Sequence, residues 1–199
     1  SSSNPLGTSI PTAPGTAGSA AAGTLVVGSQ QYYSNEIVAE LYAQMLEASG
    51  FTVTRQYQIG QREIYLPELE SGKIDVIPEY SGNLMQYYDK GATATDPAQI
   101  VETINKSLPQ GLRALKPAEA SDQDSYTVTK AFADQYGLVS IGDLTKAPQP
   151  LKLAANSEFA TRPYGPEGAK AAYGVTIELV PVEDSGGPLT LRALTDGTV

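Results

Sequence analysis

The sequence contains no cysteine and no histidine, and this double absence excludes several kinds of chemistry. Without cysteine there are no disulfides, thiol nucleophiles or cysteine zinc sites, and without histidine there is no imidazole to act as a general base. No apolar run approaches the ~18 residues that a membrane-spanning helix needs. We therefore expect no enzyme activity, no cofactor or metal, and no membrane-spanning segment.

Positive charge is also scarce, because 13 Lys and Arg residues face 22 Asp and Glu residues and the net charge is −9. Nucleic acids and anionic membrane surfaces are polyanions, so this balance excludes them as expected partners. Aromatic residues are mostly tyrosine, with 12 Tyr, three Phe and no Trp. Tyrosine offers both a ring face and a hydroxyl, which suits binding sites for polar ligands.

The first 23 residues carry no charge and consist mainly of Ser, Gly, Ala, Thr and Pro. Such a segment buries too little apolar surface to offset the entropy cost of ordering it, so residues 1–23 are predicted to be a flexible tether or a plain disordered tail. A tether of this kind often joins a lipid-anchored N-terminus to an extracytoplasmic domain. We expect an extracytoplasmic protein, at the cell surface or in the periplasm, with a lipid anchor only if a cysteine precedes this chain.

From Thr24 onward, short strands alternate with helices, which predicts an α/β fold with parallel strands. The expected elements of a first lobe, residues 24–123, are strands 24–30, 51–59 and 74–77 and helices 34–49, 61–72, 81–89 and 97–108. Those of a second lobe, residues 124–199, are strands 126–130, 151–156 and 175–180 and helices 131–137, 165–173 and 187–197. A ligand cleft is expected between the lobes.

Two details accompany this pattern. Ser34 is expected to cap a helix whose large apolar residues share one face at spacings of three and four, namely Ile37, Val38, Leu41, Tyr42, Met45 and Leu46.

Residues 191–199 repeat the pattern of residues 66–75, a helix end, a glycine and the start of a strand. Because the second copy stops at Val199, we expect the polypeptide to continue and to lack its last part here.

Polar and tyrosine-containing loops follow the strands, at the edge where open α/β sheets bind ligands. The loops are residues 29–34, 60–63 and 79–83 in the first lobe and 124–126 and 157–163 in the second. Tyrosine faces attract ammonium groups, and one arginine can hold a carboxylate with two parallel bonds. This set fits a small zwitterion, although tyrosine-lined clefts also bind sugars and phenols.

Four stretches together resemble a known family: VVGSQQYYSNEIVAELYAQMLEASGFTV, SGKIDVIPEYSGNLM, DSYTVTKAFADQYGLVSIGDL and EFATRPYGPEGAK. They resemble the substrate-binding proteins of osmoprotectant ABC importers, which bind glycine betaine, choline or carnitine. The resemblance covers residues 24–199 and implies a two-lobed type II periplasmic-binding-protein fold and ABC permease subunits as partners. In that family the chain returns to the first lobe after the second, and this return segment is missing here.

The resemblance also implies site residues. Tyr80 matches a cage tyrosine, Asn83 a hydroxyl residue that contacts the ligand carboxylate, Asp124 and Tyr126 an acidic and tyrosine pair, and Arg162 the arginine that holds the carboxylate. Ordinary roles stay open for four of them: a surface ion pair for Arg162, a turn for Asp124, core packing for Tyr126 and capping of the helix 84–88 for Asn83.

Two positions depart from the family. Gln30 stands where a lysine is common, so carboxylate binding should weaken, and Leu191 falls near another cage tyrosine. Tyr32 or Tyr33 could compensate from the first loop. The alternative prediction is therefore the same fold with a phenolic or other uncharged ligand. For Arg62 and Glu63, only their position in the loop 60–63 argues for a ligand role, and the ordinary alternative is that they pair with solvent or with each other.

Overall fold

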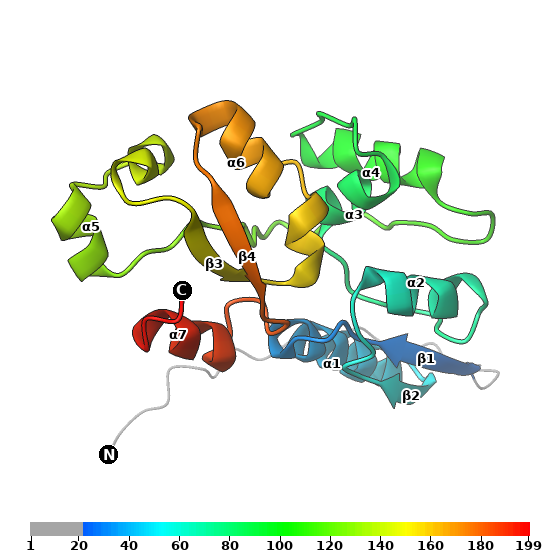
Figure 1. Cartoon of the computed structure of the whole chain (residues 1–199). Coiled ribbons are helices and arrows are strands. Elements are labelled where there is room, and N and C mark those ends of the chain that lie inside the picture. Colours follow the sequence, from blue (N-terminus) through cyan, green and yellow to red (C-terminus); the bar gives the residue numbers. More distant parts are fainter. Residues whose placement is uncertain (1–21) are drawn as a thin grey trace, which may run out of the picture.

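The computed structural model describes residues 22–199, which form two α/β units, each with its own pair of parallel strands (Figure 1). The predicted tether, residues 1–23, lies outside the described range apart from its last two residues. The parallel pairing confirms the α/β prediction from the alternating strands and helices.

In the first unit, β1 (Thr24–Gly28) pairs along its whole length with β2 (Thr52–Gln56), and α1 (Tyr33–Ala48) connects them. The predicted strand at 74–77 is wrong as a full strand, because only Val76 forms a bridge, to Val27. Pro78 follows two residues later and has no N–H to extend the ladder. The carboxyl end of β1 therefore lies between β2 on one side and Val76 on the other.

Helix α1 packs on the sheet through its small residues. Ala39 and Ala43 are fully buried, whereas Ile37, Leu41 and Met45 are 48%, 59% and 67% exposed. The side of α1 that contacts β1 and β2 is the alanine side, and of the predicted apolar residues Leu46 packs against it. The helix begins at Tyr33, so the prediction that Ser34 caps it is wrong.

The remaining first-unit helices surround a separate core. They are α2 (Arg62–Glu70), α3 (Ser81–Tyr88) and α4 (Pro97–Ser107). Their buried side chains form one cluster: Tyr65, Leu66, Leu84, Met85, Ile100 and Ile104. Asp96 caps α4 as predicted, since its side chain accepts a hydrogen bond from the Gln99 N–H. This core fixes the start of α2 and α3, which carry site residues.

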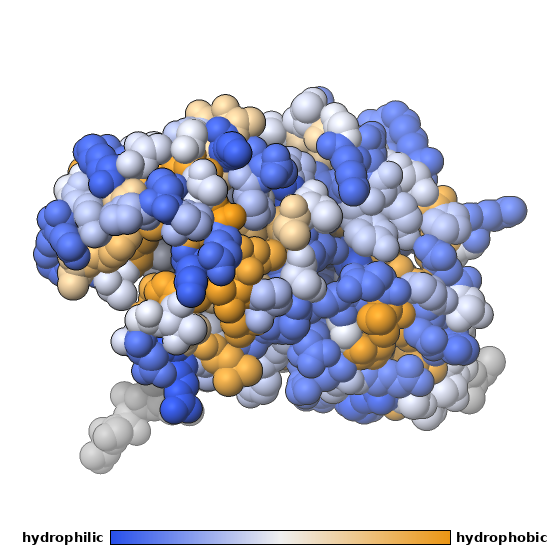
Figure 2. Space-filling model, in the orientation of Figure 1, coloured by the Kyte–Doolittle hydropathy of each residue, from blue (hydrophilic) through white to orange (hydrophobic). Residues whose placement is uncertain are grey.

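The second unit has a parallel pair of strands flanked by short helices. Its elements are α5 (Lys130–Tyr136), the 3-10 helix η1 (Ile141–Lys146), β3 (Leu151–Ala155), the 3-10 helix η2 (Ser157–Thr161), α6 (Pro166–Tyr173), β4 (Ile177–Pro181) and α7 (Pro188–Thr195). The predicted strand at 126–130 is wrong: no strand partner lies beside it among residues 22–199, and Lys130 already begins α5. Figure 2 shows hydrophobic side chains over β4, whose residues are partly exposed.

No helix within residues 22–199 is both long enough and apolar enough to cross a membrane.

Candidate functional site

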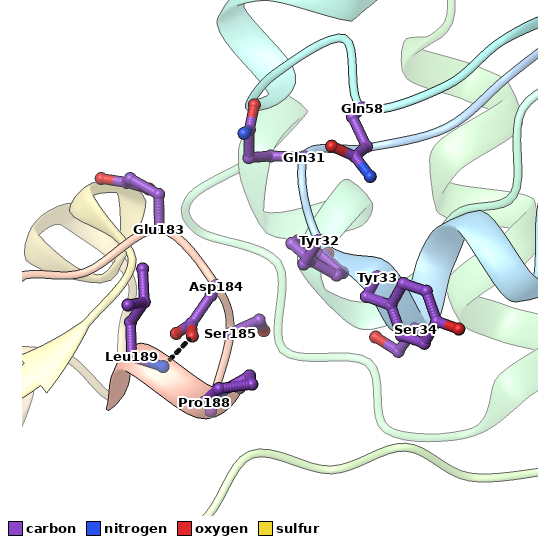
Figure 3. A pocket seen from close by; sticks show the side chains of 12 residues that line it. Gln31, Tyr32, Tyr33, Ser34, Gln58, Glu183, Asp184, Ser185, Pro188 and Leu189 are labelled. Atoms are coloured by element: carbon purple, nitrogen blue, oxygen red, sulfur yellow. Dashed lines mark hydrogen bonds between the residues drawn. The ribbon is translucent and has the colours of Figure 1, made fainter. Parts of the chain in front are cut away.

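An open cavity of about 490 Å³ lies between the two units, at the carboxyl ends of β1 and β4 (Figure 3). Its lining residues come from the loop after β1, from Gln58, and from the segment after β4; they are Gln31, Tyr32, Tyr33, Ser34, Gln58, Glu183, Asp184, Ser185, Gly186, Gly187, Pro188 and Leu189. Asp184 accepts a hydrogen bond from the Leu189 N–H at 2.6 Å and so holds the start of α7 beside the cavity. The prediction of a ligand site at strand ends places it here.

Tyr32 forms the inner wall of this cavity and stacks on Tyr80. Their ring centroids are 6.0 Å apart and the ring planes meet at 30°. Tyr32 is 6% exposed, and its hydroxyl donates a 2.6 Å hydrogen bond to Oε1 of Gln30. Burial raises the pKa of Tyr32 well above its ordinary value of 10, although nearby Arg62 opposes the change. Tyr32 is therefore a neutral phenol throughout the physiological range.

The space between these two rings is too narrow for an ammonium group. A methyl group midway between centroids 6.0 Å apart would lie about 3 Å from each ring, inside the ~3.5–4.0 Å contact distance of carbon atoms. A ligand cation would therefore have to use an outer ring face rather than enter between the rings, or move the rings apart. Tyr33, which is 71% exposed, lines the same cavity and offers a further ring.

Arg62 is a buried cation with 2% of its side chain exposed. Its Nε and Nη2 atoms pair with the Glu79 carboxylate at 3.1 and 2.8 Å, and its Nη1 lies 2.5 Å from Oε2 of Glu158. Burial lowers the pKa of Arg62, but the attraction of Glu79 more than offsets this and the pKa is raised. The ordinary alternative, in which Arg62 meets only solvent or Glu63, is therefore wrong.

Arg162 continues the same network in the second unit. Its Nη2 lies 2.9 Å from Glu158 and its Nη1 lies 2.9 Å from Asp124. Asp124 also accepts a 2.6 Å hydrogen bond from the hydroxyl of Tyr164, and this hydroxyl lies 2.8 Å from Oδ1 of Asn83. The network therefore joins the two units twice, through Arg62 with Glu158 and through Tyr164 with Asn83.

The structure brings most of the predicted site residues together, but in two groups. Tyr32 lines the cavity and Gln30 and Tyr80 contact Tyr32, whereas Asn83, Asp124 and Arg162 belong to the polar network. Tyr126 lies apart from the cavity lining. Its hydroxyl donates to the Tyr164 carbonyl and its ring meets Phe159 edge-on at 6.1 Å, which is a packing role in the second unit.

Sequence reasoning missed Arg62, Glu158 and Tyr164 as parts of this site. The contact between Arg62 and Glu158 joins residues 96 positions apart, so no local pattern indicates it. Tyr164 lies two residues after Arg162, within the same family-like stretch. This closeness to Arg162 was the one feature of the sequence that could have indicated a site role for Tyr164.

Two glycines allow the turn that carries Arg162 to pack tightly. A Cβ atom at Gly165 would overlap the carbonyl oxygen of Phe159, and one at Gly168 would overlap that of Pro163. Only glycine fits these close backbone approaches. The first turn of α6 thus supports the turn at Arg162 and Tyr164 directly.

The charges of the site favour cations over anions. In the network, Arg62 and Arg162 face the carboxylates of Glu79, Glu158 and Asp124, so negative charge is in excess by one. The charged residues that line the described cavity are Glu183 and Asp184, and no lysine or arginine is among them. Within residues 22–199, no group of three or more acidic side chains is placed to hold a metal ion.

The sequence profile of a family described as the substrate-binding domain of ABC-type glycine betaine transport systems matches residues 23–196. Glycine betaine-binding protein YehZ of Escherichia coli is 27% identical over an alignment of 188 positions, which covers 89% of this chain and 62% of that protein. A glycine-betaine-binding protein of Pseudomonas aeruginosa is 27% identical over 188 residues, which cover 60% of its length.

Solved structures share the fold. The structure of apo YehZ from E. coli matches with a TM-score of 0.53 and 27% identity, covering 88% of this chain and 66% of that chain. A glycine betaine/carnitine/choline ABC transporter structure matches with the same TM-score at 20% identity. The chain spans about three-fifths of the length of the relatives that it matches in sequence. These matches confirm the predicted α/β fold of the periplasmic-binding-protein kind.

Proposed function

Because the chain belongs to the family of substrate-binding domains of ABC-type glycine betaine transport systems, we propose that it captures a small quaternary ammonium solute such as glycine betaine, choline or carnitine. The solute would then be presented to the permease subunits of an ABC importer. Proteins of this family bind solutes rather than convert them, which agrees with the expectation that the chain is not an enzyme.

The observation that carries this proposal is the position of the tyrosines at an acidic cavity. Tyr32 and Tyr33 line a cavity whose charged lining residues are Glu183 and Asp184, and Tyr80 backs Tyr32. Ring faces attract ammonium groups by roughly 0.5–2 kcal/mol each, and nearby carboxylates add a favourable field. An organic cation, or the cationic end of a zwitterion, is the ligand that this surface suits.

The resemblance gives Arg162 the role of holding the ligand carboxylate. We propose that it does so only when the ligand carboxylate replaces one of its present partners. Both Nη atoms of Arg162 are already paired, with Glu158 and with Asp124. The Asp124 side chain is 48% exposed and can turn away, which would open one side of the guanidinium to a ligand carboxylate. We therefore expect choline, which has no carboxylate, to bind at least as well as glycine betaine.

A second candidate ligand class is a phenolic or other uncharged aromatic compound. The observation that favours it is the neutral, hydrogen-bonded pair of Gln30 and Tyr32, together with the narrow space between Tyr32 and Tyr80. A flat ring could stack on the outer face of a tyrosine, where a trimethylammonium group would find only part of a cage.

Transport also implies a location. A solute-binding component of an importer acts outside the cytoplasmic membrane, so we propose an extracytoplasmic protein. Anchoring to the membrane through a lipid, with residues 1–23 as a tether, would require a cysteine ahead of this chain.

A ligand panel tests the proposal. The protein is titrated with glycine betaine, choline, carnitine and a set of phenols, and its thermal unfolding and heat of binding are measured. A ligand that binds only the folded state adds RT ln(1 + [L]/Kd), or about 2.7 kcal/mol at 100 times Kd. Stabilisation by an ammonium compound supports the main proposal, and stabilisation by phenols alone supports the second. The absence of any response would contradict both.

A further inference from the structure

Arg62 is the one residue whose side chain forms ion pairs with both α/β units among residues 22–199. Glu79 belongs to the first unit and Glu158 to the second, and the buried guanidinium lies between them. We propose that Arg62 is a positioning residue, which fixes the relative orientation of the two cleft walls and thereby sets the affinity for the ligand. The affinity part of this inference rests on the proposed function, whereas the orientation part does not.

On each side, the partner of Arg62 holds a predicted site residue. Glu79 Oε2 accepts a 2.9 Å hydrogen bond from the backbone N–H of Tyr80. Glu158 Oε2, the atom that meets Arg62, also accepts from Arg162 at 2.9 Å. A short chain of charged contacts therefore runs from Tyr80 on one wall to Arg162 on the other, and Arg62 lies at its centre.

The loss of this guanidinium would leave two carboxylates facing each other without the cation between them. Glu79 would keep its hydrogen bond from Tyr65, and Glu158 would keep its pair with Arg162. Each carboxylate would thus keep a partner within its own unit, but like charges would now meet across the boundary in a partly buried setting, where repulsion is strong. The other direct side-chain link, from Tyr164 to Asn83, is a single uncharged contact. We expect the units to separate or to sample several orientations.

The chain offers a matched control in Arg55. This arginine also pairs with two carboxylates, Glu40 at 2.7 Å and Glu47 at 2.8 Å, but both belong to helix α1 of the first unit. Replacing Arg55 by methionine removes the same number of ion-pair partners without touching the boundary between the units. Any effect that Arg62→Met shows and Arg55→Met does not is therefore due to the contact across the boundary.

The absence of native cysteine makes a distance measurement straightforward. Spin labels on Lys106→Cys in α4 and Lys130→Cys in α5, both on exposed side chains at opposite ends of the molecule, report the orientation of the units by pulsed electron resonance (Figure 1). In ligand-free protein, Arg62→Met is expected to shift or broaden the distance distribution, and Arg55→Met to leave it unchanged. Glu158→Gln, which keeps the pair of Arg62 with Glu79, is the second variant and should act in the same direction.

Dissociation of choline, measured by stopped flow, is the second readout. Arg62→Met is expected to raise the dissociation rate by about tenfold or more, as the loss of one partner in a buried charged contact does at other interfaces. Arg62→Lys should not restore the slow rate, because an ammonium cannot form the fork to Glu79 and also reach Glu158.

The outcomes separate the two ideas. An unchanged distance distribution in both Arg62→Met and Glu158→Gln would overturn the inference, whatever the ligand does. A changed distribution with an unchanged choline dissociation rate would overturn its affinity part. If the unmodified protein binds none of the ammonium compounds, the proposed function fails, and the distance measurement still decides whether Arg62 fixes the two units.

Discussion

Tyr32 donates a 2.6 Å hydrogen bond to Oε1 of Gln30, so the amide of Gln30 is engaged by the protein. Its Nε2 atom donates to the Pro78 carbonyl at 3.3 Å, and the residue is 2% exposed. The resemblance leads us to expect a lysine at this position. The structure has instead a neutral, buried and hydrogen-bonded side chain next to the cavity.

Gln30→Lys is therefore expected to favour ligands that carry a carboxylate. A hydrogen bond that involves a charged group contributes roughly 1.5–3 kcal/mol, so the affinity for glycine betaine relative to choline should rise by about tenfold to a hundredfold. Unfolding should become easier, because an ammonium replaces a buried neutral amide. Isothermal titration with both ligands and a thermal unfolding curve measure the two effects.

Gln31→Lys is the control, because Gln31 is exposed and lines the same cavity. It brings the same charge to the mouth of the cavity without burying it. Because choline is a net cation and glycine betaine is net neutral, long-range repulsion should weaken choline binding and leave betaine binding nearly unchanged, and Gln31→Lys measures this contribution to the ratio. An equal change of the betaine-to-choline ratio in both variants would show that the buried position has no special role.

Tyr80→Ala is expected to weaken the binding of an ammonium ligand, while Tyr80→Phe is expected to retain most of it. The alanine variant removes the ring that stacks on Tyr32, and one ring face contributes roughly 0.5–2 kcal/mol, or a few-fold to about thirtyfold in Kd. The phenylalanine variant keeps the ring and removes only the hydroxyl. Titration calorimetry with choline distinguishes them, and an equal loss in both variants would point to the hydroxyl rather than the ring.

The order of strands and helices could be predicted because it depends on local patterns. Glycine stops ended the helices as expected: Gly137 and Gly174 have φ values of 63° and 72° and close α5 and α6. Whether residues 126–130 form a strand could not be decided from their own sequence. Its sequence favours extended backbone, but a strand also needs a neighbour, and none lies beside it in the described part of the chain.

The candidate site shows the same limit at the level of side chains. The loops that carry Gln30, Tyr32 and Tyr80 could be predicted, because strand ends of parallel sheets meet at one edge. The buried position of Arg62 could not, because it depends on Glu158 of the other unit. Helix α1 is a similar case, since alanine packs closer to a sheet than the larger apolar residues on its other side do.

Ligand binding is expected to be nearly independent of pH between about 6 and 9. The chain has no histidine. Burial raises the pKa of Tyr32, and burial together with the hydrogen bond to Asp124 raises that of Tyr164, so neither phenol loses its proton in this range. The Kd for choline should change by less than about twofold. Titrations at several pH values check this, and a clear step in Kd would indicate a titrating group that the site as described lacks.

The stability contributed by Arg55 should disappear in acid. Hydrogen bonds from Arg55 and then from Tyr57 lower the pKa of Glu40 from its ordinary value of 4.5 to about 2. A carboxyl whose pKa is lower in the folded state stabilises the fold above its unfolded pKa, and this contribution is lost as the pH falls from about 4.5 to about 2. Urea unfolding of the unmodified protein and of Arg55→Met should therefore differ at pH 7 and converge near pH 2. A difference that persists at pH 2 would mean that Arg55 stabilises the fold by packing rather than by charge.

Gly168→Ala is expected to damage both the stability of the second unit and the site. An alanine Cβ there would overlap the carbonyl oxygen of Pro163, the residue after Arg162, so either α6 or the turn must move. Overpacking of this kind costs roughly 1–3 kcal/mol. Gly91→Ala is the control, because its added Cβ would meet only an ordinary contact at 3.4 Å with the Asp89 side chain. The free energy of unfolding and the choline Kd are measured for both variants. A Gly168→Ala protein with lowered stability and an unchanged Kd would contradict the expected damage to the site and would show that α6 yields rather than the turn at Arg162, or that binding does not depend on the position of this turn.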